Sequence, residues 1–248
     1  MALVELRTSS IDGKCGIAEI LLCAPKGNTL SVSVLNELIN VLQQIHEQEF
    51  GCLTISGGNH VFSVGADIDQ LLEPEMGEVL LDRLSEAVSL IATFEGISIA
   101  AISGFALGGG AELALACDYI AGNDNSRIGF PEVSLGVIPG GGATQLLPNR
   151  IGVAKSIELI LTGRIVAGQE AARMNLIDVC IGPEALSGWS LAFAEQIVSS
   201  NIDQIRHIKE LTSATVNVDS TELLRERVAL LRLAKTLPKL DKSQLIKD

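Results

Sequence analysis

The chain has 248 residues, of which 47% are hydrophobic and 19% are charged, and this suits one large globular domain or a core with a small appendage. Thirty acidic against eighteen basic side chains give a net charge of −12, which repels phosphate backbones and anionic lipid surfaces at long range. With only six Phe, one Trp and one Tyr, modules that stack bases on aromatic rings are disfavoured as well, so we expect neither a nucleic-acid-binding nor a membrane-surface protein.

Strand-like and helix-like patterns alternate along the chain. Short apolar runs predict strands at residues 16–23, 53–56 and 98–102. Apolar residues at helical spacing predict helices at 33–46, 79–94, 111–117, 155–161, 168–174 and 186–199, and a helical tail from about 202 to 235. Ser31 is expected to cap the helix that follows it. The alternation predicts an α/β core with parallel strand pairing.

The cysteines and the N-terminus bear on the cellular compartment. No Cys-x-x-Cys pair and no metal-binding histidine spacing occurs, so we expect no metal and buried thiols in a reducing compartment. The N-terminal residues show no targeting pattern, and the uncharged stretches 96–111 and 133–149 are too short to span a bilayer. A cytoplasmic protein without membrane association is expected.

Three consecutive glycines at 108–110, within ALGGGAELALACD, precede a predicted helix. Each glycine opposes helix formation by about 1 kcal/mol relative to Ala, so a close backbone approach or a positive φ is indicated. The free N–H groups and the positive dipole at a helix start suit an anion or a developing oxyanion. Close helix–strand packing without a ligand is the alternative. A phosphate cradle is weakly supported, because neither the Walker pattern nor G-x-G-x-x-G is met.

Three further stretches contain candidate site residues. Glu132 in FPEVSLGVIPGGG lies among apolar residues that would solvate a carboxyl group poorly, although a surface glutamate beside a turn is the plainer interpretation. FSVGADI, at 62–68, is by itself a turn of small residues after a strand. PKGNTLS, at 25–31, is a loop that leads into a helix.

Taken in order, FSVGADI, ALGGGAELALACD and FPEVSLGVIPGGGATQLL resemble the crotonase (enoyl-CoA hydratase/isomerase) superfamily. PKGNTLS and LTGRIVAGQEAARMNLID are similar to two further segments of that family, so the resemblance runs from about residue 15 to 180. It implies an α/β fold, with a crotonase-like spiral of ββα units at 1–190 and a helical C-terminal trimerisation region at 191–248. It also implies assembly as a homotrimer or homohexamer.

The resemblance further implies an acyl-CoA thioester substrate, with no separate cofactor because coenzyme A is part of the substrate. By position, Ala66 and Gly109 match the two backbone amides of the oxyanion hole, and Glu112 and Glu132 match the two catalytic glutamates. The positions assigned to substrate binding are Lys26, Gly65, Asp67, Ile68, Gly108 and Gly140.

These assignments suit hydration of a trans-2-enoyl-CoA to 3-hydroxyacyl-CoA, a lyase reaction. Glu112, in the first helical turn, would stay ionised and activate water, whereas desolvation would raise the pKa of Glu132 and make it the proton donor. A Δ3,Δ2-enoyl-CoA isomerase, which needs Glu132 alone, or another acyl-CoA enzyme of the superfamily is the alternative. Binding of thioester or RNA without turnover is a further one, and the net charge disfavours RNA.

The sequence departs from the family pattern at three places. The segment before the glycines reads GISIAAISG and lacks the usual Lys-Pro. Asp69 stands where many relatives have a lysine near the coenzyme. The final residues, LPKLDKSQLIKD, lack the usual phenylalanine-bearing ending that contacts coenzyme A.

Overall fold

The computed structural model describes residues 2–10, 15–213, 224–225 and 227–231. Its larger sheet has the strand order β1-β2-β3-β5-β7-β10. The strands are β1 (Val4–Ser10), β2 (Gly16–Leu22), β3 (Phe50–Ser56), β5 (Ile97–Ile102), β7 (Tyr119–Asn123) and β10 (Val179–Ile181). Within this sheet β2, β3, β5, β7 and β10 pair in parallel, and β1 alone is antiparallel to its neighbour. The predicted parallel α/β core is therefore confirmed.

A second sheet of four short strands has the order β4-β6-β8-β9. The strands are β4 (Val61–Ser63), β6 (Phe105–Leu107), β8 (Arg127–Gly129) and β9 (Ile165–Ala167). β4, β6 and β8 each follow a strand of the larger sheet and precede a helix. The chain therefore winds through successive ββα units, as the resemblance implied.

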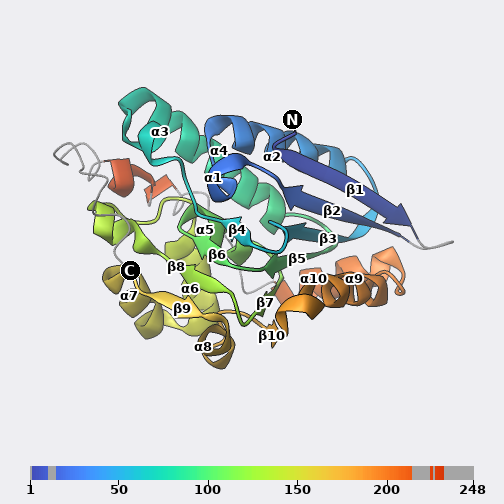
Figure 1. Cartoon of the computed structure of the whole chain (residues 1–248). Coiled ribbons are helices and arrows are strands. Elements are labelled where there is room, and N and C mark those ends of the chain that lie inside the picture. Colours follow the sequence, from blue (N-terminus) through green and yellow to red (C-terminus); the bar gives the residue numbers. More distant parts are fainter. Residues whose placement is uncertain (1, 11–14, 214–223, 226, 232–248) are drawn as a thin grey trace.

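The helices are α1 (Pro25–Asn28), α2 (Val32–His46), α3 (Ile68–Leu72), α4 (Pro74–Ala92), α5 (Gly109–Leu115), α6 (Ala143–Ile151), α7 (Val153–Thr162), α8 (Gly168–Arg173), α9 (Leu186–Ile197) and α10 (Ile202–Ser213), with 3-10 turns η1 (Pro131–Leu135) and η2 (Pro183–Ala185). α2 buries its apolar stripe, and the Ser31 side chain accepts a bond from Val34 N at 3.3 Å, so the predicted cap is confirmed. In Figure 1, α2 and α4 cover one face of the larger sheet, while α9 and α10 lie across the other.

The C-terminal helices are continuous with the core. Ala194 and Val198, at the end of α9, are buried against Ile17, Cys52 and Ile99 of the sheet. The expected domain boundary at residue 190 falls inside α9. The predicted tail helix is present as α10 and again at residues 227–231, whereas residues 214–223, 226 and 232–235 of that prediction lie outside the described residues. Within the described part of the chain, no helix combines the length and apolarity that a bilayer crossing requires.

Candidate active site

Ala66 and Gly109 come from different ββα units and meet at one place. Gly109 is the first residue of α5, where a backbone N–H has no acceptor within its own helix. Ala66 lies between β4 and α3, and Leu30 bridges to its two chain neighbours: Leu30 N donates to Gly65 O at 2.8 Å and Asp67 N donates to Leu30 O at 3.0 Å. In such a parallel bridge the Ala66 N–H points away from Leu30.

The close approach of these two segments is visible at their glycines. A Cβ added at Gly65 would stand 3.4 Å from Gly109 N, and one added at Gly109 would stand 3.6 Å from Ala66 N. The structure therefore brings together the two main-chain amides that the sequence assigned to an oxyanion hole.

Two buried polar side chains, Asn28 and Ser63, fix the Ala66 segment, and the sequence analysis did not identify either of them. Asn28 Nδ2 donates to the carbonyls of Val61 and Phe62 at 3.0 and 3.1 Å. Ser63 Oγ donates to Asn28 O at 2.8 Å and accepts from Gly65 N at 3.1 Å. Asn28 has a φ of +57°, a conformation that asparagine tolerates better than most residues.

Glu112 is buried within the core, with 1% of its surface exposed. Its Oε1 accepts hydrogen bonds from Gly141 N at 2.8 Å and Ala143 N at 3.1 Å, at the start of α6. Main-chain donors at a helix N-terminus stabilise a carboxylate. Glu112 N donates to Gly108 O at 2.9 Å, so residue 112 follows Gly108 by one turn of α5.

Glu132 reaches the same turn from η1. Its Oε1 lies only 2.7 Å from the position that a Cβ on Gly108 would take, and its Oε2 is shielded from solvent. Gly108 has a φ of +49°, a backbone conformation that L residues rarely adopt. Glu132 therefore lies directly against the backbone that leads into Gly109.

The glycine run serves packing as well as the site. A Cβ on Gly110 would stand 2.6 Å from Ser63 O and 2.7 Å from Ser63 Cβ, so α5 and β4 can approach this closely only because position 110 is glycine. Of the readings left open for the three glycines, close packing applies to Gly110, whereas Gly108 and Gly109 border the glutamate and the amide of the candidate site.

The remaining residues assigned to substrate binding lie on α3, on α1 and in the glycine turn before α6. Asp67 caps α3 by accepting from Asp69 N and Gln70 N at 3.0 and 3.3 Å, and Ile68 begins that helix. Lys26 is exposed in α1, and the adjacent Gly27 O accepts from Val64 N at 3.0 Å, which places α1 beside the Ala66 segment.

Gly140 is buried. It precedes Gly141, whose N–H binds Glu112.

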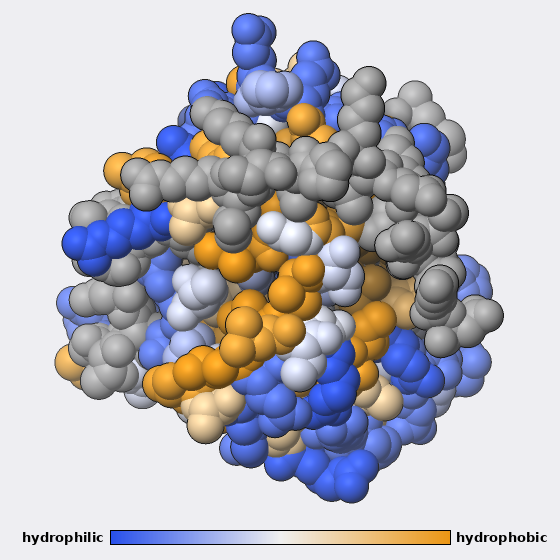
Figure 2. Space-filling view, turned by 90° about the vertical axis from the view of Figure 1, so that its left-hand side faces the viewer, coloured by the Kyte–Doolittle hydropathy of each residue, from blue (hydrophilic) through white to orange (hydrophobic). Residues whose placement is uncertain are grey.

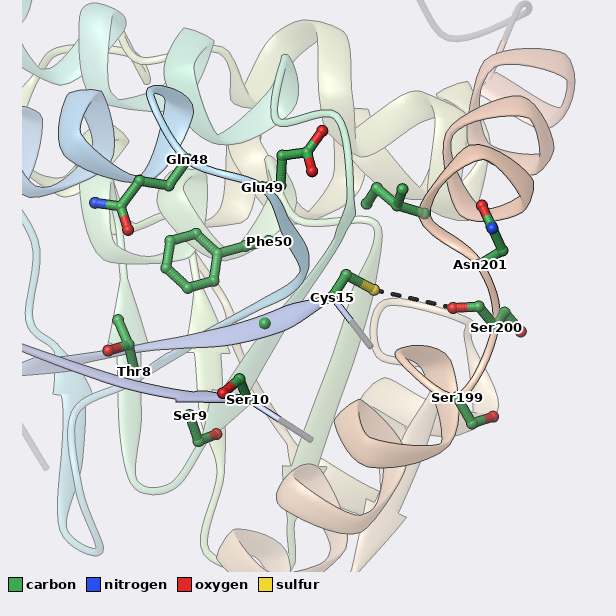
Figure 3. Close-up of a pocket in the computed structure, with 12 residues that line it drawn as sticks. Thr8, Ser9, Ser10, Cys15, Gln48, Glu49, Phe50, Ser199, Ser200 and Asn201 are labelled. Carbon is green, nitrogen blue, oxygen red and sulfur yellow. Dashed lines mark hydrogen bonds between the residues drawn. The ribbon is translucent and has the colours of Figure 1, made fainter. Parts of the chain in front are cut away.

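A cavity of about 780 Å³ lies away from the two glutamates, between the ends of β1 and β2 and the turn from α9 into α10 (Figure 3). Its lining is mainly polar, and Cys15 Sγ donates to Ser200 O at 3.9 Å across it. Burial raises the pKa of the Cys15 thiol, which lowers its reactivity. Among the described residues, no group of His, Cys, Asp and Glu side chains is arranged to hold a metal ion.

Comparisons with known proteins show the family to which the chain belongs. The family model described as enoyl-CoA hydratase/isomerase matches residues 12–243. A probable enoyl-CoA hydratase from Rhizobium meliloti (strain 1021) is 34% identical over 199 residues, which are 80% of this chain and 77% of that protein. A probable enoyl-CoA hydratase from Mycobacterium leprae (strain TN) is 33% identical over 223 residues, or 89% of this chain and 87% of that protein.

A similar fold is found in solved structures. The crystal structure of an enoyl-CoA hydratase from Bacillus anthracis matches with a TM-score of 0.80 and 30% identity, covering 93% of this chain and 90% of that one. The crystal structure of an enoyl-CoA hydratase from Bacillus halodurans shares the fold with a TM-score of 0.84 at 23% identity, covering 93% of this chain and 95% of that one. The order of the ββα units, the placement of the site segments and these matches together show that the chain belongs to the enoyl-CoA hydratase/isomerase family.

Proposed function

We propose that the protein is an enoyl-CoA hydratase, which adds water across the double bond of a trans-2-enoyl-CoA thioester to give a 3-hydroxyacyl-CoA. The observation that carries the proposal is the approach of four groups from separate segments of the chain. The main-chain amides of Ala66 and Gly109 adjoin each other. The Glu132 carboxyl group lies against Gly108, and Glu112 is on the first turn of α5, with its carboxyl group against Gly141 and Ala143.

The amides of Ala66 and Gly109 stabilise the thioester oxygen. When water attacks the β-carbon of the conjugated thioester, electron density moves onto this oxygen. Two fixed N–H donors strengthen their hydrogen bonds as that charge grows, and losing one such donor typically raises the barrier by about 2.7–4 kcal/mol. The bonds that Asn28 and Ser63 make hold the Ala66 donor in place before the substrate arrives.

The two glutamates have opposite roles. Glu112 is hydrogen-bonded as a carboxylate by Gly141 N and Ala143 N, so it acts as the base that takes a proton from the attacking water. Glu132 has an oxygen shielded from solvent, where the ionised form would lose hydration, and it acts as the acid that protonates the α-carbon. Hydroxide adds to the β-carbon and a proton to the α-carbon, and exchange of one proton through solvent restores both carboxyl groups.

Coenzyme A enters as part of the substrate, no separate cofactor or metal is required, and Lys26 supplies a positive charge beside the Ala66 segment.

Assembly as a homotrimer or homohexamer is supported by apolar side chains that α7 exposes: Val153, Ile157 and Leu161 are 64%, 53% and 66% exposed. Figure 2 shows apolar residues gathered across the centre of the face on that side of the molecule. Five free thiols fit a cytoplasmic location, where cysteines stay reduced.

The test is hydration of crotonyl-CoA, followed by loss of the conjugated enoyl-thioester absorbance. The purified protein should hydrate this substrate, and Glu112→Gln and Glu132→Gln should each lower kcat by about 10²–10⁴-fold. Glu195→Gln, on the exposed surface of α9, is the matched control and should leave kcat unchanged. If Glu112→Gln kept full hydration, its role as base would be wrong. Efficient conversion of a 3-enoyl-CoA with poor hydration would establish the isomerase reaction instead.

A further inference from the structure

A short helical segment near the C-terminus, residues 227–231, packs onto α4 beside the candidate site. Arg227 forms an ion pair with Asp82 of α4, and Leu230 is buried, with 2% of its surface exposed. The segment lies on the left of Figure 1, on the side that faces the viewer in Figure 2. A residue far along the chain is thereby brought to the glycine turn that precedes α6.

Leu230 and Leu81 of α4 both touch Gly140. A Cβ on Gly140 would stand 2.6 Å from Leu230 Cδ1 and 3.2 Å from Leu81 Cδ2, so these two methyl groups fill the space beside the glycine. Leu81 is 2% exposed, like Leu230, and the contact is closed to solvent.

The apolar surface continues from this contact to the proposed reacting groups. Leu84 Cδ2 would be 2.8 Å from a Cβ on Gly141 and 3.1 Å from one on Gly109. The position of the Gly141 Cβ is also 2.6 Å from Glu112 Oε2. Leu84 therefore adjoins both the oxyanion amide and the backbone that holds the proposed base, and Leu81 and Leu230 contact the preceding residue of that backbone, Gly140.

The reaction geometry gives this surface a function. In the proposed hydratase the thioester oxygen would lie on the Ala66 and Gly109 amides and the β-carbon beside Glu112, and an acyl chain directed past Gly141 would then follow the apolar surface described above. The next groups along that path are Gly140, Leu81 and Leu230. These are the groups that an extending acyl chain meets.

We propose that Leu230, with Leu81, forms the end wall of the acyl site and sets the longest acyl chain that the enzyme accepts. This inference rests on the proposed hydratase function. Because the side chains of Leu230 and Leu81 already fill the space beside Gly140, the wild-type protein prefers short 2-enoyl-CoAs, and truncation of Leu230 opens room for a longer chain.

The experiment compares kcat/KM for crotonyl-CoA and trans-2-decenoyl-CoA. Leu230→Ala removes the Cγ and both Cδ atoms, and each additional methylene that becomes buried contributes about fourfold. We therefore expect the ratio of decenoyl to crotonyl kcat/KM to rise roughly 10- to 15-fold for two methylenes. A ratio of rate constants does not depend on the fraction of protein that is folded. Leu231→Ala, in the same helical segment, is the control and should leave this ratio within about twofold of the wild-type value.

Two further variants keep the test decisive if Leu230→Ala does not fold. Leu81→Ala opens the wall from the opposite side of Gly140 and should shift the ratio in the same direction, and Leu230→Val is a milder truncation. Unchanged ratios in the folded variants, or a wild-type preference for the decenoyl substrate, would overturn the end wall while leaving the hydratase intact. A protein that hydrates neither substrate would instead overturn the proposed function and the end wall with it.

Discussion

Gly108→Ala should displace the carboxyl group of Glu132, the proposed acid, while the backbone around it stays in place. The new Cβ would stand 2.7 Å from Glu132 Oε1, whereas ordinary van der Waals contact begins at 3.4 Å. The difference, 3.4 minus 2.7, requires the carboxylate to retreat by about 0.7 Å. Because the contact is with the far end of a flexible side chain, Glu132 yields and the backbone stays in place.

Two costs follow, and they are measured separately. Alanine at a φ of +49° is strained, which costs roughly 1–3 kcal/mol of unfolding free energy, or about 2–4 °C in Tm for each kcal/mol. A catalytic group that is misplaced by about 1 Å can lose about 10²-fold in rate. We therefore expect a modest decrease in Tm and a loss of about 100-fold in kcat for crotonyl-CoA hydration.

Gly152→Ala is the matched control. Gly152 has a φ of +79°, and nothing lies within 4 Å of the position of its Cβ, so its alanine variant carries the backbone strain without touching a glutamate. Thermal denaturation should give similar decreases for both variants, and only Gly108→Ala should lose activity. In a Glu132→Gln background, Gly108→Ala should add little further loss, since both changes act on the same carboxyl group. Equal activity of the two alanine variants would refute the placement of Glu132 as the acid.

Three further predictions address the support of the site and the core. Asn28→Ala and Asn28→Gly both leave the carbonyls of Val61 and Phe62 without their donor, but only alanine is strained at the positive φ of this position. Tm should therefore fall by more in Asn28→Ala, and equal decreases measured by calorimetry would contradict the backbone argument. Lys209→Met removes the 2.7 Å contact with Asp118 Oδ2, which should cost about 1–3 kcal/mol in urea unfolding, and an unchanged midpoint would refute a contribution of this contact to holding α10. Burial raises the pKa of Cys117 to about 12 and also raises the pKa of Cys52, so neither thiol forms thiolate near neutral pH. Mass spectrometry after maleimide labelling of the native protein should find both unmodified, and rapid labelling of either would refute their burial.

The long elements could be predicted because their periodicity is unambiguous. The apolar stripe of α2 is visible in the sequence and buried in the structure. α4 begins at Pro74, earlier than the predicted start at 79, because proline suits the first helical turn and the apolar stripe alone does not mark it. The strand predicted at 53–56 begins at Phe50, since a fully buried parallel strand has no polar alternation to mark its end.

The short strands of the second sheet could not be predicted. β4, β6, β8 and β9 have three residues each, too few for any periodicity. In the site, the family resemblance indicated Ala66, Gly109, Glu112 and Glu132. The sequence could not predict that Asn28 and Ser63 tie the Ala66 segment down, because their partners are main-chain carbonyls and amides that carry no residue-specific pattern.

The covalent layout of the site has a consequence for how such a chain can diversify. Gly109 and Glu112 are on one helix, α5, which is buried along its whole length, whereas Glu132 arrives on the separate turn η1. The two groups proposed to polarise the carbonyl and to activate water are therefore fixed relative to each other and to the core. Glu132, the proposed proton donor, is on a separate turn. Substitutions around η1 would therefore change which carbon is protonated without disturbing the groups that bind the thioester oxygen. A few mutations could in this way convert one acyl-CoA reaction into a related one.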